Sequence, residues 1–164
     1  MPDVASPLVT LRRATRDDSR RVWEWRNDPV ARRASLTSAE IAYEEHARWF
    51  FQKLRDPKVR LFIATDHHGK GLGYVRFELS GQEAEMSVGI DPQRRGQGVG
   101  TAAITRGSEQ LLATEPIQRI VARVRRDNPA SIAVFERAGF VRRAARQTVR
   151  IDIYEMSYER RISD

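Results

Sequence analysis

The sequence has no cysteine and only three histidines, His46, His67 and His68. The lack of cysteine excludes disulfide bonds, thiolate metal sites and a cysteine nucleophile. Three histidines are too few for a histidine-rich metal cage, so no metal site is expected. No apolar run approaches the roughly 20 residues that span a bilayer, and residues 1–4 do not begin the apolar segment of a signal peptide. These absences predict a cytoplasmic, globular protein.

Positive charge is in excess. The chain has 29 Lys and Arg residues against 22 Asp and Glu, a net charge of +7, and only three of the basic residues are lysine. Arginine pairs are spread over the whole chain, which is typical of a solvated surface. The segment 119–150 is denser in arginine, with Asp127 and Glu136 as its only acids. No zinc-finger or aromatic–basic RNA pattern accompanies it, so anionic partners are expected, but not nucleic acid.

The hydrophobic pattern predicts one strand, two helices, an antiparallel meander, and then strands that alternate with helices. This order is typical of a mixed α/β sheet in a single domain, which we expect over residues 1–164. Strands are expected at 8–11, 61–64, 73–79, 85–90 and 117–124, and as a final pair from 141 onward and at 151–154. Helices are expected between Thr15 and Pro29, between Thr37 and Asp56, at 99–113, and between Asn128 and Gly139.

Capping patterns mark the predicted helix ends. The segments 15–18 and 37–40 each have the spacing of a capping box, a Thr followed three residues later by an acid. Asn128 followed by Pro129 is typical of an N-cap and the first position of a helix. Gly139 is typical of the residue just after a helix.

Three glycines alternate with other residues in the segment 95–100, between a predicted strand and a predicted helix. Such glycines let the backbone curl so that successive N–H groups converge on an anion at the helix N-terminus. The loop lacks the G-x-G-x-x-G spacing of a dinucleotide site and the Gly-Lys-Ser/Thr ending of a Walker A loop. It therefore predicts a phosphate or pyrophosphate site of another class.

Two segments resemble sequence hallmarks of the GNAT acyltransferase superfamily. Residues 85–100, EMSVGIDPQRRGQGVG, are similar to its acyl-CoA-binding motif, R/Q-x-x-G-x-G/A after a strand. Residues 128–140, NPASIAVFERAGF, resemble its N-x-x-S-x-x-x-Y-x-x-x-G-F pattern. The resemblance implies a single-domain GNAT fold, an α/β (α+β) arrangement with a mixed, mostly antiparallel central sheet flanked by helices. It also implies acetyl-CoA as co-substrate.

The resemblance further implies how CoA binds. Backbone amides of the glycine loop hold the pyrophosphate, two arginines add charge, and pantetheine lies where the strand ending at Ile90 splays from the next. A backbone N–H at Val88 or Gly89 binds the thioester oxygen. Asn128 contacts the pantetheine arm, with a plain N-cap role left open. The implied cofactor-binding residues are Val88, Gly89, Ile90, Arg94, Arg95, Gly96, Gln97, Gly98, Val99, Gly100, Asn128, Ser131 and Phe135.

The implied chemistry is direct attack of a primary amine on the thioester, which a base and an acid assist. Glu85 is the candidate base, and an ordinary surface glutamate is the alternative. The family's usual acid is a tyrosine, where this chain has Phe135, which cannot donate a proton. Tyr154 and Ser131 are the candidate catalytic substitutes. The alternatives are a thiolate that leaves unassisted, or a regulatory module that binds acyl-CoA without turnover.

The first two helices carry aromatic and basic residues that the resemblance assigns to the acceptor cleft. The patterns W-R-N-D-P and H-x-x-W resemble a branch with N-acetyltransferases of 4-amino nucleotide sugars, as in the pseudaminic acid pathway, and N-terminal acetyltransferases of ribosomal proteins. The candidate substrate-binding residues are Trp25, Arg26, Asn27, His46, Trp49 and Arg76. Core packing is the alternative for the tryptophans, and a surface position on the helix is the alternative for His46.

An amino nucleotide sugar is the acceptor that the sequence favours. Its diphosphate would meet arginines 26, 32, 33 or 76, and Trp or Tyr rings would stack on it. The rival acceptor is the N-terminus of a ribosomal protein, although a chain of charge +7 repels a basic peptide. No membrane partner is expected, and a homodimer is left open.

Overall fold

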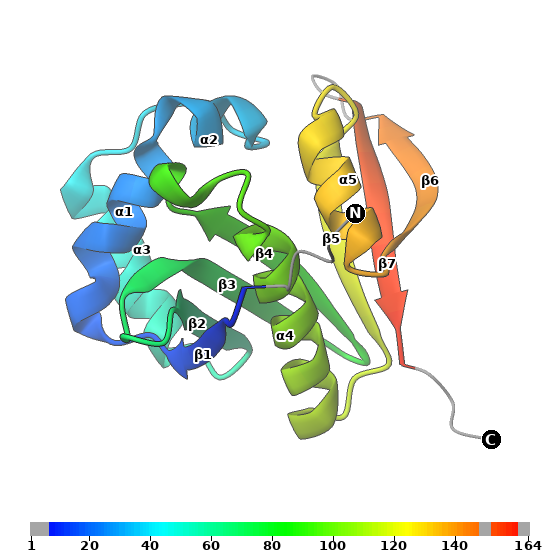
Figure 1. Ribbon diagram of the computed structural model, residues 1–164, viewed down its shortest axis with the longest axis horizontal. Helices are drawn as coiled ribbons and strands as arrows, with labels where there is room; N and C mark the ends of the chain where they lie inside the picture. The colour runs from blue at the N-terminus through cyan, green and yellow to red at the C-terminus, as the bar shows by residue number, and fades with distance from the viewer. Residues whose placement is uncertain (1–6, 148–151, 161–164) are drawn as a thin grey trace.

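Seven strands form one sheet in the computed structural model, in the order β1-β2-β3-β4-β5-β7-β6 (Figure 1). The structure describes residues 7–147 and 152–160. The strands are β1 (Thr10–Arg13), β2 (Val59–Thr65), β3 (Gly71–Ser80), β4 (Glu83–Ile90), β5 (Arg119–Arg125), β6 (Val141–Gln147) and β7 (Asp152–Glu159). Neighbouring strands are antiparallel except β4 and β5, which run parallel. The predicted mixed, mostly antiparallel α/β sheet is confirmed.

Two strands begin later in the chain than the sequence predicted. β1 begins at Thr10 and β5 at Arg119, each two residues later than predicted. Ile117 precedes β5 but is buried, so the apolar pattern marked burial there rather than strand pairing. The final strand is confirmed from Asp152 onward, whereas Ile151 lies outside the described residues.

Five helices and two short 3-10 turns complete the described part of the chain. The helices are α1 (Ser19–Asn27), α2 (Pro29–Ala34), α3 (Tyr43–Arg55), α4 (Val99–Thr114) and α5 (Pro129–Arg137), and the 3-10 turns are η1 (Arg16–Asp18) and η2 (Pro92–Arg94). The predicted helix starts at Val99 and after Asn128 are confirmed. Within the described residues, no helix is both long and apolar enough to cross a membrane.

The two faces of the sheet carry separate hydrophobic cores. In β2, Phe62 and Ala64 belong to the core that contains α4, whereas Leu61 and Ile63 belong to the core that contains α1 and α3. Successive side chains of a strand point to opposite faces. Therefore α4 covers one face of the sheet, and α1 and α3 cover the other (Figure 1).

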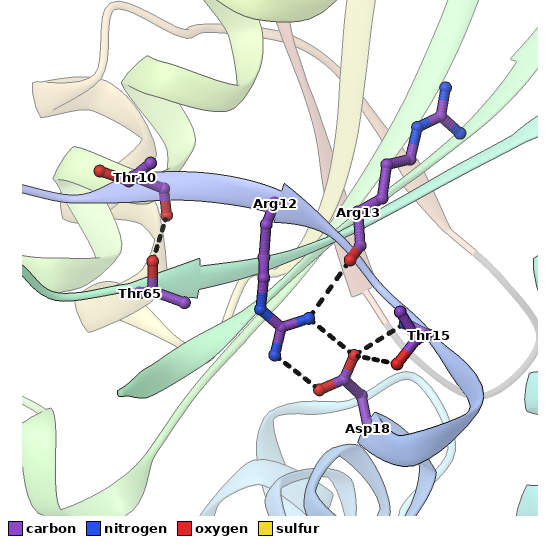
Figure 2. Close-up of polar contacts among 6 residues, drawn as sticks. All are labelled: Thr10, Arg12, Arg13, Thr15, Asp18 and Thr65. Carbon is purple, nitrogen blue, oxygen red and sulfur yellow. Dashed lines mark hydrogen bonds and ion pairs between the residues drawn. The ribbon is translucent and has the colours of Figure 1, made fainter. Parts of the chain in front are cut away.

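The predicted cap at Thr15 is confirmed, although it opens the 3-10 turn η1 and not α1 itself. The Asp18 carboxylate accepts a hydrogen bond from the Thr15 N–H at 2.8 Å. It also binds the Arg12 guanidinium through both oxygens, at 2.8 and 2.9 Å (Figure 2). On the neighbouring strand, the Thr65 hydroxyl donates to the Thr10 carbonyl at 3.3 Å (Figure 2). These bonds fix the passage from β1 into α1.

The short helix α2 was not predicted from the sequence. Pro29 does end α1, as predicted, but it also occupies the first position of α2. The Asp28 carboxylate caps this helix by accepting from the N–H groups of Val30 and Ala31, at 3.1 and 3.0 Å. Asp-Pro therefore acts here both as a stop and as a start signal.

The predicted start of the next helix at Thr37 is wrong, because α3 begins at Tyr43. The loop before it is held against α1 by two hydrogen bonds. The Ile41 N–H donates to Asn27 Oδ1 at 3.1 Å, and the Ile41 carbonyl accepts from Trp23 Nε1 at 2.8 Å. These tertiary contacts outweigh the local capping box.

Candidate active site

The two central strands β4 and β5 pair over only a few residues. Their register covers Glu83–Glu85 opposite Arg119–Val121. Beyond Glu85, β4 stays paired with β3 as far as Ile90, but no further pairing with β5 occurs among the described residues. The strands therefore diverge toward their carboxyl ends (Figure 1). This is the splay that the resemblance implied, and it leaves backbone groups of β4 without a partner strand.

The glycine loop follows the end of β4 and opens α4. Gly96 and Gly98 have φ angles of 73° and 78°, in the left-handed region that favours glycine. Gly98 is the N-cap of α4, and no described side chain caps that helix. An added Cβ at Gly100 would lie 3.4 Å from Val134 on α5 and 3.7 Å from Ile90. The N–H groups at the start of α4, which no described side chain caps, thus lie between the end of β4 and α5.

Both arginines of the loop are ion-paired in this structure. Arg95 Nη2 lies 2.8 Å from Asp28 Oδ2, and Arg94 Nη2 lies 3.8 Å from Asp66 Oδ2. Burial alone would raise the pKa of Asp28. Its hydrogen bonds, foremost the one from Arg95, lower the pKa by a larger amount, so the net pKa lies below the ordinary value. Arg95 thereby connects the glycine loop to the cap of α2.

Asn128 and Ser131 bind each other at the start of α5. Asn128 Oδ1 accepts from the Ser131 N–H at 3.2 Å, and Asn128 Nδ2 donates to Ser131 Oγ at 3.0 Å. The N-cap role of Asn128 is confirmed. Its predicted contact with pantetheine, and the proposed acid role of Ser131, stay predictions.

Phe135 belongs to the core beneath α5. It is 8% exposed, and its ring centroid lies 5.2 Å from that of Phe140 in an edge-on contact. Tyr154, the other candidate acid, is half-buried on β7. The guanidinium groups of Arg126 and Arg142 lie 5.0 and 5.2 Å from the centre of its ring. Of the two aromatic residues, only Tyr154 carries a proton to give.

Glu85 lies where β4 and β5 are still paired, opposite Val121. Its carboxylate is 3.8 Å from Arg123 Nη1, and both side chains are 41% exposed. Four residues of extended chain, about 13 Å, separate it from Gly89. A base at this position would have to act on the amine through intervening water.

The structure brings four of the predicted acceptor residues together: Arg26, His46, Trp49 and Arg76. The Trp49 ring has the Arg26 guanidinium 4.1 Å and the Arg76 guanidinium 5.0 Å from its centre. Such distances are those of cation–π contacts. The four side chains come from α1, α3 and β3 and lie on the face opposite α4.

His46 is buried, with 1% of its surface exposed, so the alternative of a surface histidine is wrong. Its Nε2 lies 2.8 Å from the Ser19 carbonyl, and its Nδ1 lies 3.0 Å from Arg26 Nη1. A carbonyl only accepts and a guanidinium only donates, so Nε2 carries the proton and Nδ1 accepts. Burial, and then the charge of Arg26, lower the pKa of His46 to about 4.

Two further predicted acceptor residues have structural roles. Trp25 is 3% exposed in the core between α1 and α3, as the core-packing alternative allowed. Asn27 accepts the hydrogen bond from Ile41 that holds the loop before α3. Trp49 packs against the cluster that contains Trp25.

Tyr74 and Ser87 belong to this site but were missed in the sequence. A Cβ on Gly89 would lie 2.3 Å from Tyr74 Cε1, so the tyrosine ring packs directly on the Gly89 backbone. Ser87 Oγ accepts from Arg76 Nη2 at 3.1 Å. The alternation of the strand could have indicated Tyr74, because Tyr74 and the predicted residue Arg76 lie on the same face of β3.

Comparison with known proteins identifies the family of this chain. The sequence model of the acetyltransferase (GNAT) domain matches residues 9–141. The chain belongs to the GNAT acetyltransferase family. A mycothiol acetyltransferase of Clavibacter michiganensis is 33% identical over 93 residues, which cover 56% of this GNAT chain and 28% of that relative. The GNAT chain therefore spans less than a third of the length of that protein.

Solved structures show the same fold. The spermidine N-acetyltransferase of Vibrio cholerae, in complex with CoA and spermine, matches with a TM-score of 0.83 and 20% identity, over 92% of this GNAT chain and 95% of that one. The aminoglycoside acetyltransferase AAC(6')-Ib, in complex with paromomycin and acetyl-CoA, matches with a TM-score of 0.82 and 22% identity, over 93% of each chain.

Proposed function

We propose that this GNAT chain transfers an acetyl group from acetyl-CoA to the primary amine of a small acceptor. The amine nitrogen attacks the thioester carbonyl, the C–N bond forms as the C–S bond breaks, and the nitrogen's proton is lost as the CoA thiolate leaves. The observation that supports this most directly is the divergence of β4 from β5 beside the left-handed glycines Gly96 and Gly98.

The proposed CoA site uses the backbone more than the side chains. The N–H groups of the segment 95–100 bind the pyrophosphate at the start of α4. Arg94 and Arg95 contribute charge when they turn from Asp66 and Asp28 toward the phosphates. A β4 backbone N–H at Val88 or Gly89 donates to the thioester oxygen, where negative charge develops during attack.

Few side chains are available to deprotonate the amine or to protonate the leaving thiolate. Glu85 acts as the base through water, because about 13 Å of β4 separate it from Gly89. Phe135 has no proton to give, so the thiolate leaves with help from Tyr154 or without help. Because a thiolate is a stable leaving group near neutral pH, neither route excludes turnover.

For the acceptor, we favour an amino nucleotide sugar. The support is the cationic cluster around Trp49, in which Arg26 and Arg76 face one ring. A polyamine such as the spermine bound by the Vibrio cholerae neighbour would be repelled there. The N-terminus of a ribosomal protein is the second candidate, and the exposed arginines of this chain favour it only if ribosomal RNA lies nearby.

A thiol-release assay with acetyl-CoA tests the function. The acceptor panel contains a 4-amino nucleotide sugar, N-terminal peptides of ribosomal proteins, spermine and an aminoglycoside. We expect thiol release with the nucleotide sugar and much slower release with spermine. Tight CoA binding without release by any amine would contradict the function and favour a binding module.

A further inference from the structure

The cluster around Trp49 holds more positive than negative charge. Within the described part of the chain, Arg26 forms no ion pair, and its one hydrogen bond is to the neutral ring of His46. Arg76 Nη1 lies 3.3 Å from Glu78 Oε1, but that carboxylate is also bound by Lys53. One carboxylate is therefore shared between two cations, and the third cation, Arg26, has no ion-pair partner among the described residues.

This imbalance has an energetic consequence. Arg76 is 21% exposed and Arg26 is half-buried, so water solvates both guanidinium groups only in part. Burial, and to a smaller degree the charge of Arg76, lower the pKa of Arg26, against opposing contributions from Tyr74 and Glu45. A partly desolvated cation gains free energy from an anion that reaches it with hydrogen bonds.

The cluster also lies next to the position where the reaction is proposed. The ring of Tyr74 packs on Gly89. Burial raises the pKa of the Tyr74 hydroxyl, and the charges of Arg26 and Arg76 lower it by a smaller amount. Ser87, bound to Arg76, lies two residues before Gly89. An anion on the two guanidinium groups would therefore be one tyrosine ring away from the β4 backbone.

His46 fixes the geometry of Arg26. Its ring is anchored by the Ser19 carbonyl on one side and presents an acceptor nitrogen to Arg26 on the other. Arg26 is thus held against Trp49 by a neutral acceptor that adds no negative charge of its own. A carboxylate in place of His46 would have cancelled the charge.

We propose that Arg26 and Arg76 form an anion subsite that binds a phosphate or carboxylate group of the amine acceptor, with Trp49 as its floor and His46 as a positioning residue for Arg26. This inference rests on the proposed function, since it assigns the part of the acceptor that does not react. It predicts that the enzyme selects amines by their negative charge.

Pairs of amines that differ in one anionic group test the subsite. Glucosamine 6-phosphate is compared with glucosamine for the phosphate, and tyrosine with tyramine for the carboxylate. In at least one of the two pairs, we expect the wild-type kcat/KM to be about tenfold higher for the anionic amine than for its partner without the anionic group. Arg26→Met and Arg76→Met should each remove that preference by raising the KM for the anionic acceptor, while the KM for acetyl-CoA stays unchanged.

Arg20→Met is the matched control. Arg20 is on the same helix as Arg26, and its guanidinium also stacks on an aromatic ring, that of Tyr43, at 4.2 Å. The control should keep the wild-type preference. His46→Gln, whose amide can still accept from Arg26, should retain more of the preference than His46→Ala.

A second measurement does not depend on turnover. At saturating CoA, which fills the glycine loop, inorganic phosphate is titrated into the wild type and the two Met variants, with thermal unfolding as the check of folding. We expect phosphate to bind the wild type about tenfold more tightly than either variant. If a Met variant is unfolded, Arg26→Gln or Arg76→Gln replaces it.

The outcomes separate the two proposals. No turnover with any amine contradicts the proposed function, and the phosphate titration then decides the subsite alone. Turnover without preference for an anion, or a preference that survives both substitutions, overturns the subsite and leaves the function intact. Equal phosphate binding by wild type and variants also overturns it.

Discussion

The guanidinium of Arg95 lies 2.8 Å from the carboxylate of Asp28, so the glycine loop is ion-paired with the N-cap of α2. A CoA pyrophosphate at the loop would compete with Asp28 for this arginine. Asp28→Asn removes the competing charge and keeps a good N-cap residue. We expect it to tighten CoA binding by about threefold, consistent with a partly exposed ion pair.

Calorimetric titration of CoA measures this effect at fixed salt concentration. In an Arg95→Gln background, Asp28→Asn should have no effect, since no guanidinium is left to release. Weaker CoA binding by Asp28→Asn alone, with α2 intact, would show that the ion pair supports the site rather than competing with it.

Gly96→Ala should weaken CoA binding by at least about tenfold. The φ angle of Gly96 is 73°, and an added Cβ meets no protein atom within 4 Å, so the methyl group would enter the space proposed for the pyrophosphate. Gly69→Ala is the matched control, because Gly69 has φ 79° and equally open space, but lies in the β2–β3 turn. Both should lose about 1 kcal/mol of stability, and only the first should lose CoA affinity.

The buried His46 should make the fold sensitive to acid. Its pKa is lowered to about 4 from the ordinary 6.5, so below pH 6.5 the unfolded state takes up a proton that the folded state does not. The free energy of unfolding should be constant above about pH 7 and fall between pH 6.5 and 4, by at most about 1.4 kcal/mol per pH unit.

Urea unfolding of wild type and His46→Gln across this range measures that contribution. The variant should lack the part of the slope between pH 6.5 and 4, whereas His67→Gln, at an exposed position, should keep it. Identical pH profiles for wild type and His46→Gln would mean that His46 takes up its proton in the folded state as well.

Phe135→Ala should destabilise the protein by about 3–5 kcal/mol, because it removes a ring that is 8% exposed and packed against Phe140. Val141→Ala, at a position that is 60% exposed, should change stability by less than about 0.5 kcal/mol. Chemical denaturation compares the two. A loss of about 1 kcal/mol or less for Phe135→Ala would show that α5 is loosely packed.

Local patterns predicted the parts of the fold that local chemistry determines. The sequence predicted the cap at Thr15, the cap at Asn128 and the glycine loop, because each depends on residues close in sequence. The capping box at Thr37 failed because Ile41 is held by Asn27 and Trp23, which lie 14 and 18 residues away. No local pattern contains those bonds.

The candidate site shows the same division. Arg26, His46, Trp49 and Arg76 were predicted as acceptor residues, and they do meet around one ring. The burial of His46 follows from its spacing of four from the buried Phe50 on α3, but its hydrogen bond to the Ser19 carbonyl could not be read. The pairing of Arg95 with Asp28, 67 residues apart, is likewise a product of the folded chain.

The position of β7 in the sheet bears on how the molecule is made. β7 lies between β5 and β6, although both precede it in the chain, and it pairs with each of them. During synthesis, β5 and β6 therefore emerge with no strand between them, and that half of the sheet closes only after residue 159 has left the ribosome. Until then β5 has an open edge, and a nascent chain in that state is the one most exposed to aggregation.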